Sequence, residues 1–152
     1  MAKVKHGRTN LSSKKLTPQE MSDFESIFSV SIPDSFKDHY LKINGGFVSE
    51  SDVEAELWGL PVNGFNPIKH GKLTIERLIE DIHEIKPNNG QNGVWGYKQF
   101  VPFSYDLGGN IIFISLKYDD WGEVHLYAPD GGNIINIDSS FTSFLRRLYK
   151  MD

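Results

Sequence analysis

The sequence predicts a single α+β domain with a mainly antiparallel central sheet. The first observation is the stretch 100–116, in which two apolar runs flank a turn at 106–110. The second is the order of the predicted elements: helices, then strands with one inserted helix, then a closing helix. Composition agrees, because 152 residues with 39% hydrophobic and 24% charged side chains are ordinary for one globular domain.

The stretch 100–116 predicts two neighbouring antiparallel strands. Residues 111–116 are almost continuously β-branched or aromatic, which is typical of a strand buried on both faces near the centre of a sheet. Pro102 lacks an amide hydrogen, so we expect the first strand to lie at an edge or to be interrupted there. The connecting turn contains residues that tolerate unusual backbone angles or bond neighbouring amides, and at least one of its glycines should have a positive φ.

Two helices are predicted ahead of the sheet. Thr17 and Glu20 have the spacing of a capping box, and Pro18 occupies the first helical position. A second amphipathic helix is expected over 33–43, where apolar side chains recur at helical spacing. It should end at Asn44-Gly45-Gly46, because glycine adopts the left-handed helix terminator at the least cost.

The remaining elements follow from shorter patterns. A third helix is expected from about Thr74, with apolar spacing as far as Ile85, and Pro87 forbids its continuation. Asp138 or Ser139 is expected to cap the last helix. Short strands are predicted at 47–48, 57–60, 124–127 and 133–137.

Composition excludes several classes of protein. Cysteine is absent, which excludes disulfides, thiolate nucleophiles and metal sites with cysteine ligands. No run approaches the roughly 20 apolar residues that span a bilayer, and the amino terminus has no apolar signal-peptide core. We therefore expect a cytoplasmic protein without membrane contact.

Charge divides the chain unevenly. The first 15 residues contain five cations and no acid, so 11 Lys and Arg remain against 20 Asp and Glu, and the body carries about −9. We interpret 1–15 as a flexible basic leader and 16–152 as the domain, although such a tail also suits nucleic-acid contact or association with the acidic body. The acidic body favours a basic partner over direct binding of nucleic acid.

No catalytic constellation is evident. The five histidines lack metal-ligand spacing, and the glycine turns match no phosphate-binding loop. His83 is expected to be solvated on a helix, and His125 to make a cross-strand polar contact. Adjacent carboxylates such as Asp119 and Asp120 support hydrolysis only across a cleft, so a hydrolase is the least favoured reading. We predict no enzyme activity, no cofactor and no metal.

Aromatic side chains on polar segments suggest a protein-binding surface, since Trp and Tyr often anchor interfaces. For Trp58 we favour a core position, and for Trp121 a surface role. The aromatics on these polar segments are Trp58, Trp95, Tyr97, Tyr118 and Trp121.

Three segments together resemble a known family. They are 32–46, with its Ile-Pro start and Asn-Gly-Gly end; 102–110, followed by a hydrophobic strand; and the closing helix from 139 to 145. In this order they resemble the SUKH superfamily, also called the Smi–Knr family, over about 16–148. The basic leader lies outside the family pattern.

The resemblance implies a non-enzymatic α+β domain. Bacterial members commonly act as immunity proteins that bind and neutralise polymorphic or contact-dependent toxins, many of them nucleases, and fungal relatives act as scaffolds. The positions that match the family motifs are expected to be structural; they are Asn44, Gly45, Gly46, Asp106, Gly108, Gly109 and Asn110.

Electrostatics suggests how such a protein would act. A nuclease needs a basic cleft, which an acidic inhibitor can occupy after fast, steered association. We expect a basic cognate toxin as partner and a monomer or weak homodimer; the alternative is an interaction scaffold without a toxin. The predicted toxin-binding residues are Glu50, Asp52, Glu54 and Glu56 in one loop and Asp119, Asp120, Trp121 and Glu123 in another.

Overall fold

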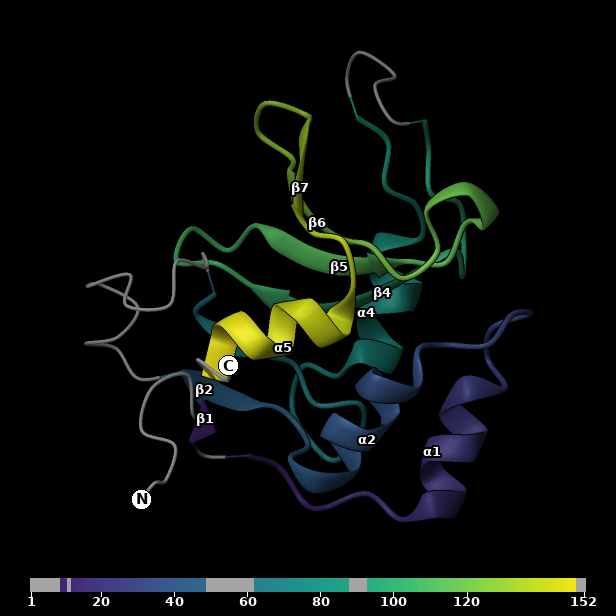
Figure 1. Cartoon of the computed structure of the whole chain (residues 1–152), viewed down its shortest axis with the longest axis vertical. Coiled ribbons are helices and arrows are strands. Elements are labelled where there is room, and N and C mark those ends of the chain that lie inside the picture. The colour runs from purple at the N-terminus through teal and green to yellow at the C-terminus, as the bar shows by residue number, and fades with distance from the viewer. Residues whose placement is uncertain (1–8, 11, 49–61, 88–92, 150–152) are drawn as a thin grey trace.

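The computed structural model describes residues 9–10, 12–48, 62–87 and 93–149, and confirms the predicted α+β class (Figure 1). The predicted strand at 57–60 lies outside these residues. In chain order the elements are β1 (Thr9–Asn10), α1 (Pro18–Glu25), α2 (Asp34–Lys42), β2 (Gly46–Val48), β3 (Gly64–Phe65), α4 (Ile75–Ile82), β4 (Phe100–Tyr105), β5 (Ile111–Ser115), the 3-10 turn η1 (Tyr118–Asp120), β6 (Val124–Ala128), β7 (Asn133–Asp138) and α5 (Phe141–Tyr149).

The seven described strands form one sheet in which spatial order follows chain order and every neighbouring pair is antiparallel. The register of β4 against β5 shifts between Pro102 and Ser104, which confirms the predicted interruption. The strand is not at the sheet edge, but β3 pairs only with Ser104 and Tyr105. Pro102 therefore has a paired strand on one side alone, so its missing amide hydrogen leaves no ladder bond unmade.

Both faces of β5 are buried, as its sequence predicts. Ile112 and Ile114 belong to the main core, together with aromatic side chains from α1, α2 and α5, which lie below the long strands in Figure 1. Phe113 points to the opposite face, where it packs with Trp95 and Phe100. The alternation follows from the two-residue period of a strand. It fixes the register of the central hairpin, because a slip by one residue would exchange the two sets of side chains.

The helix starts and ends follow local chemistry. Thr17 Oγ1 accepts from Glu20 N at 3.1 Å and Glu20 Oε1 accepts from Thr17 N at 2.9 Å, so the predicted capping box is confirmed. The third helix ends at Ile82, because His83 adopts φ 66°. Ile85, which we predicted to be helical, instead pairs with Trp95 in a β-bridge. Its helical spacing is coincidental, since one left-handed residue changes the direction of the chain.

The predicted cap of the last helix is wrong by one or two residues. Ser140 Oγ accepts from Ser143 N at 3.0 Å, so Ser140 caps the helix instead of Asp138 or Ser139. Asp138 is nearly buried, and its Oδ2 accepts from Arg147 at 3.0 Å. It therefore ties the end of β7 to the last helix.

Part of the predicted leader contacts the domain. Thr9 and Asn10 pair with β2, and Ser13 N donates to Asn44 O at 2.9 Å. The boundary at residue 16 stays a prediction, but the chain from Thr9 onward is joined to the sheet edge. Across the described residues, no helix has the length and apolarity needed to cross a membrane.

Candidate functional site

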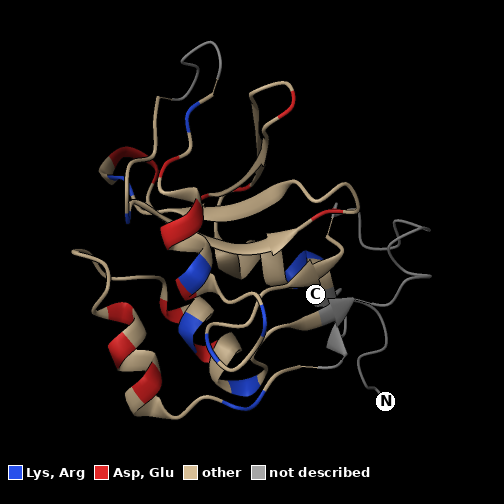
Figure 2. Ribbon diagram, turned by 180° about the vertical axis from the view of Figure 1, so that it is seen from behind, with Lys and Arg blue, Asp and Glu red and all other residues tan. Residues whose placement is uncertain are grey.

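The connection between β5 and β6, residues 116–123, places four of the predicted toxin-binding residues next to one another. Tyr118 is fully exposed, Asp119 is exposed, and the side chain of Glu123 is 40% exposed. Figure 2 shows the acidic segments of η1 and α1 along the same side of the molecule. The connection therefore presents aromatic and acidic groups to solvent.

Asp120 differs from its neighbours, because its carboxylate points inward. Ser115 Oγ donates to Asp120 Oδ1, and His125 Nε2 lies 3.1 Å from Asp120 Oδ2. Ser115 Oγ in turn accepts from Trp95 Nε1 at 2.8 Å and from Lys117 N at 3.2 Å. This network links β5, η1 and β6, so the connection is fixed to two buried side chains of the adjacent strands.

Asn136, on β7, lies against the ring of His125. Asn136 Nδ2 lies 3.4 Å from Val124 O and 3.3 Å from Asp138 O, so it is a donor. Asn136 Nδ2 also lies 3.3 Å from Glu123 Oε1 and 3.4 Å from His125 Nδ1, so its two protons are shared among four neighbours. The predicted cross-strand polar contact of His125 is confirmed.

Asp120, Glu123 and His125 form the candidate metal group of the described residues, with ligand atoms within 4.8 Å of one another. Carboxylate and imidazole groups at this separation suit a divalent transition metal. The same groups are already in contact with one another, because His125 Nε2 lies 3.1 Å from Asp120 Oδ2 and 3.7 Å from Glu123 Oε1. The cluster is thus an imidazole–carboxylate pair whose residue types could also hold a divalent metal.

The same cluster contains the residue types of a serine hydrolase triad in the wrong arrangement. A nucleophilic serine must donate to a histidine, with the carboxylate behind the ring. Here the carboxylate of Asp120 lies between Ser115 and His125, and Ser115 is fully buried. The cluster is built to position a loop and offers no activated hydroxyl.

Trp121 is held at the surface, 44% exposed, as its sequence context predicts. Its Nε1 donates to Ser31 O at 2.9 Å, which joins the β5–β6 connection to the segment between α1 and α2. Beside the ring lies a shallow cavity of 290 Å³, lined also by Pro33, Asp34 and Ser140. We call Asp34, Tyr118, Asp119, Trp121 and Glu123 the Trp121 surface.

The other aromatic predictions have mixed outcomes. Tyr97 is 39% exposed, as expected, whereas Trp95 is fully buried and its predicted exposure is wrong. Lys117 Nζ lies 4.0 Å above the Trp95 ring. The polar and glycine neighbours of Trp95 in the sequence suggest a surface loop. Its ring nevertheless packs with Phe113 on the sheet face opposite the main core. His83 is exposed, and its ring stacks on Tyr97. Trp58 and the predicted acidic loop with Glu50, Asp52, Glu54 and Glu56 lie outside the described residues.

The side chain of Asp106 organises the β4–β5 turn. The carboxylate of Asp106 accepts from Gly108 N at 3.0 Å, from Asn110 N at 2.8 Å and from Asn110 Nδ2 at 2.9 Å. Gly109 has φ 82°, which confirms the predicted left-handed glycine. The turn is therefore closed by its own side chains.

Asn44 joins three segments. Its Nδ2 donates to Lys14 O and Lys69 O, and its Oδ1 accepts from Ile68 N, each at 2.9 Å. Gly45 follows with φ 81°, and a Cβ there would lie 2.7 Å from Pro67 N. Gly46 also has a positive φ, 122°. The Asn-Gly-Gly motif therefore lets the chain pass close to the segment after β3.

Comparison with family models adds the deciding observation: the model of the SMI1 / KNR4 family (SUKH-1) matches residues 15–147. The chain belongs to the SMI1/KNR4 family. The match covers both connections of β5 and confirms the resemblance inferred from the sequence. A comparison with curated proteins found no match.

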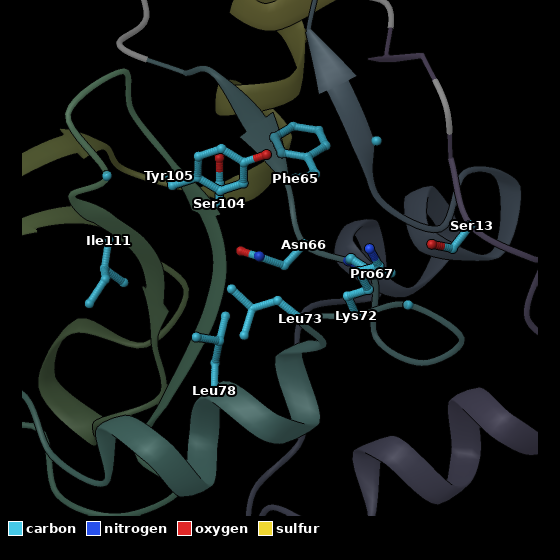
Figure 3. A pocket seen from close by; sticks show the side chains of 13 residues that line it. Ser13, Phe65, Asn66, Pro67, Lys72, Leu73, Leu78, Ser104, Tyr105 and Ile111 are labelled. Carbon is cyan, nitrogen blue, oxygen red and sulfur yellow. The ribbon is translucent and has the colours of Figure 1, made fainter.

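This SMI1/KNR4-family domain also contains a cavity of 480 Å³ that sequence reasoning missed (Figure 3). Its apolar walls come from β3, the segment before α4, α4 itself and the β4–β5 hairpin, and include Phe65, Leu73, Leu78 and Ile111. Asn66 and Tyr105 add polar groups. No local pattern indicates such a site, because its residues are brought together by the sheet.

Proposed function

We propose that the protein is a non-enzymatic immunity protein that binds and neutralises a cognate toxin of a bacterial polymorphic or contact-dependent system. The observation that carries the proposal is the Trp121 surface in a chain of the SMI1/KNR4 family. Exposed Trp and Tyr side chains beside acids, on a connection held in place by the Asp120 hydrogen bonds, are typical of a protein interface.

The charge of the Trp121 surface suits a basic partner. Asp34 is 91% exposed in its side chain, and Asp119 and Glu123 are also accessible. A nuclease binds a polyanion and therefore has a basic cleft, which acids on an inhibitor can fill. Because exposed acids act mainly on the encounter, they should raise the association rate more than they slow dissociation.

The sequence predicts that Asp120 contacts the toxin, but in this proposal it has a positioning role. Its carboxylate is used by Ser115 and His125, and its side chain is only 18% exposed. We therefore assign it to positioning the connection. Direct toxin contact is assigned to Asp119, Trp121 and Glu123, with Glu50, Asp52, Glu54 and Glu56 as the second predicted acidic set.

The test uses the gene next to the one that encodes this chain. If that gene encodes a toxin, the two proteins should co-purify as a stable complex in which toxin activity is lost. A scaffold without a toxin partner would leave the activity intact. Saturable turnover of a substrate by the purified chain alone would support the hydrolase alternative and contradict the proposal.

A further inference from the structure

Asn66 is a nearly buried amide whose side chain has no hydrogen-bond partner among the described residues. The residue is 6% exposed, and its backbone is fixed: Asn66 N donates to Phe103 O at 2.8 Å, and Asn66 O accepts from Tyr40 Oη at 2.7 Å. Figure 3 shows its carboxamide directed into the 480 Å³ cavity. The side-chain oxygen and nitrogen of Asn66 stay accessible from the cavity, so both can form hydrogen bonds to a ligand.

The surroundings of Asn66 define the ligand further. The walls are largely apolar, and the ring of Tyr105 and the side chains of Leu78 and Ile111 border the space (Figure 3). Burial raises the pKa of Tyr105, so its hydroxyl stays protonated at neutral pH and remains a donor. Pockets of this size, with apolar walls and few polar groups, are typical of small-molecule sites.

Charge at the cavity is unlike that of the rest of the protein. The described lining residues include one lysine, Lys72, and no Asp or Glu, although the chain has 20 acids against 16 basic residues. Lys72 is therefore the charged group that an anionic substituent would meet at this cavity. The described lining residues offer no counter-charge for a cation.

We propose that this cavity binds a small planar cyclic amide of the nucleobase type, with its donor–acceptor edge on the Asn66 carboxamide and any anionic substituent near Lys72. An asparagine amide presents a donor beside an acceptor, which is the complement of a base edge. The apolar walls enclose the planar ring. This proposal goes beyond toxin binding and involves no residue of the Trp121 surface.

The experiment titrates uracil, adenine and their nucleoside 5′-monophosphates into ¹⁵N-labelled full-length protein, observed by NMR. We expect saturable shifts of the Asn66 side-chain NH₂ and of the Phe65, Ser104 and Ile111 amides, with a Kd of about 1 mM or tighter for at least one probe. The monophosphate should bind at least about threefold more tightly than its base at low salt, and Lys72→Ala should abolish that advantage.

Two asparagine variants decide whether Asn66 serves a ligand or the fold. Asn66→Leu has a similar volume and removes an amide without a described partner, so it should melt at or above the wild-type temperature and lose the probe shifts. Asn44→Leu, the matched control, removes three hydrogen bonds and should melt well below wild type. The proposal is overturned if no probe shifts the pocket resonances, if Asn66→Leu retains binding, or if it destabilises the fold as much as Asn44→Leu.

Discussion

The two connections of β5 use an aspartate in opposite ways. In the β4–β5 turn, Asp106 bonds residues two and four positions ahead, and the turn closes on itself. In the β5–β6 connection, Asp120 reaches back to Ser115 and forward to His125 in the adjacent strands. In the first arrangement the Asp106 carboxylate bonds groups of its own turn. The second fixes the base of the connection and leaves Tyr118, Asp119 and Trp121 exposed.

The difference shows how one sheet supports both a structural turn and a binding surface. A carboxylate that bonds its own turn stabilises local geometry and adds little recognition chemistry. A carboxylate that anchors a longer connection to neighbouring strands lets other side chains be presented without loss of order. Pre-ordered side chains bind with a smaller entropy cost.

The largest expected effect comes from removing the Asp120 carboxylate that anchors the β5–β6 connection. Asp120→Ala leaves Ser115 and His125 nearly buried without their partner, and we expect it to lower the free energy of unfolding by about 3 kcal/mol. Asp119→Ala, one residue away and exposed, should change it by less than about 0.5 kcal/mol. Urea unfolding of both variants measures the difference. Equal stabilities would show that the Asp120 network does not anchor the connection.

Acid unfolding tests a core residue, His39, that belongs to neither connection of β5. Burial, assisted by the charge of Lys42, lowers the pKa of His39 from 6.5 to about 4. Between these values the unfolded state binds a proton that the folded state does not, so stability present above pH 6.5 is lost as pH falls. We expect a loss of about 2 kcal/mol between pH 7.5 and 5 from this group.

His39→Leu checks the acid effect, because leucine cannot take up the proton. Urea unfolding at pH 7.5 and 5 should show a much flatter pH dependence for the variant than for wild type. If the two proteins lose equal stability over this range, the acid-sensitive group lies elsewhere.

The β4–β5 turn predicts a contrast between adjacent glycines. Gly109→Val places a β-branched residue at φ 82° and should cost about 1–2 kcal/mol. Gly108 lacks a positive φ, and a Cβ there would have its nearest described neighbours at an ordinary 3.6 Å, so Gly108→Val should cost clearly less. Thermal melts compare the two. A reversed order would mean that the turn is assembled differently.

Much of the fold could be predicted because its determinants are local. The capping box at Thr17, the Asp106 turn and the buried pattern of β5 each lie within a few residues. Trp95 could not be predicted, since the Ser115 hydroxyl that accepts its indole hydrogen is 20 residues away. The β-bridge of Ile85 could not be predicted for a similar reason: its partner Trp95 lies in a later segment, and the left-handed His83 gives no clear signal in the sequence.

The candidate site was predictable in part. Exposure of Tyr118, Asp119 and Trp121 follows from their position on a polar connection between strands. The inward turn of Asp120 does not, because it depends on Ser115 and His125 being placed by two strands. Asn66 gave no signal at all, since an asparagine after a short strand usually indicates a turn.

Association kinetics with the cognate toxin test the central claim, that the β5–β6 connection presents the toxin-binding surface. The double variant Asp119→Lys with Glu123→Lys spares the Asp120 anchor. We expect it to lower the association rate at low salt at least about tenfold without unfolding the protein, and the wild-type rate to fall as ionic strength rises. Asp130→Lys with Glu84→Lys makes the same change in net charge outside the connection and should have a much smaller effect.

Equal effects of the two double variants would reduce the role of the acids to net charge. The Trp121-surface account is contradicted if reversal of Asp119 and Glu123 leaves both the association rate and its salt dependence unchanged. If reversal of the predicted loop acids Glu50, Asp52, Glu54 and Glu56 also changes neither, the acidic-loop mechanism as a whole fails.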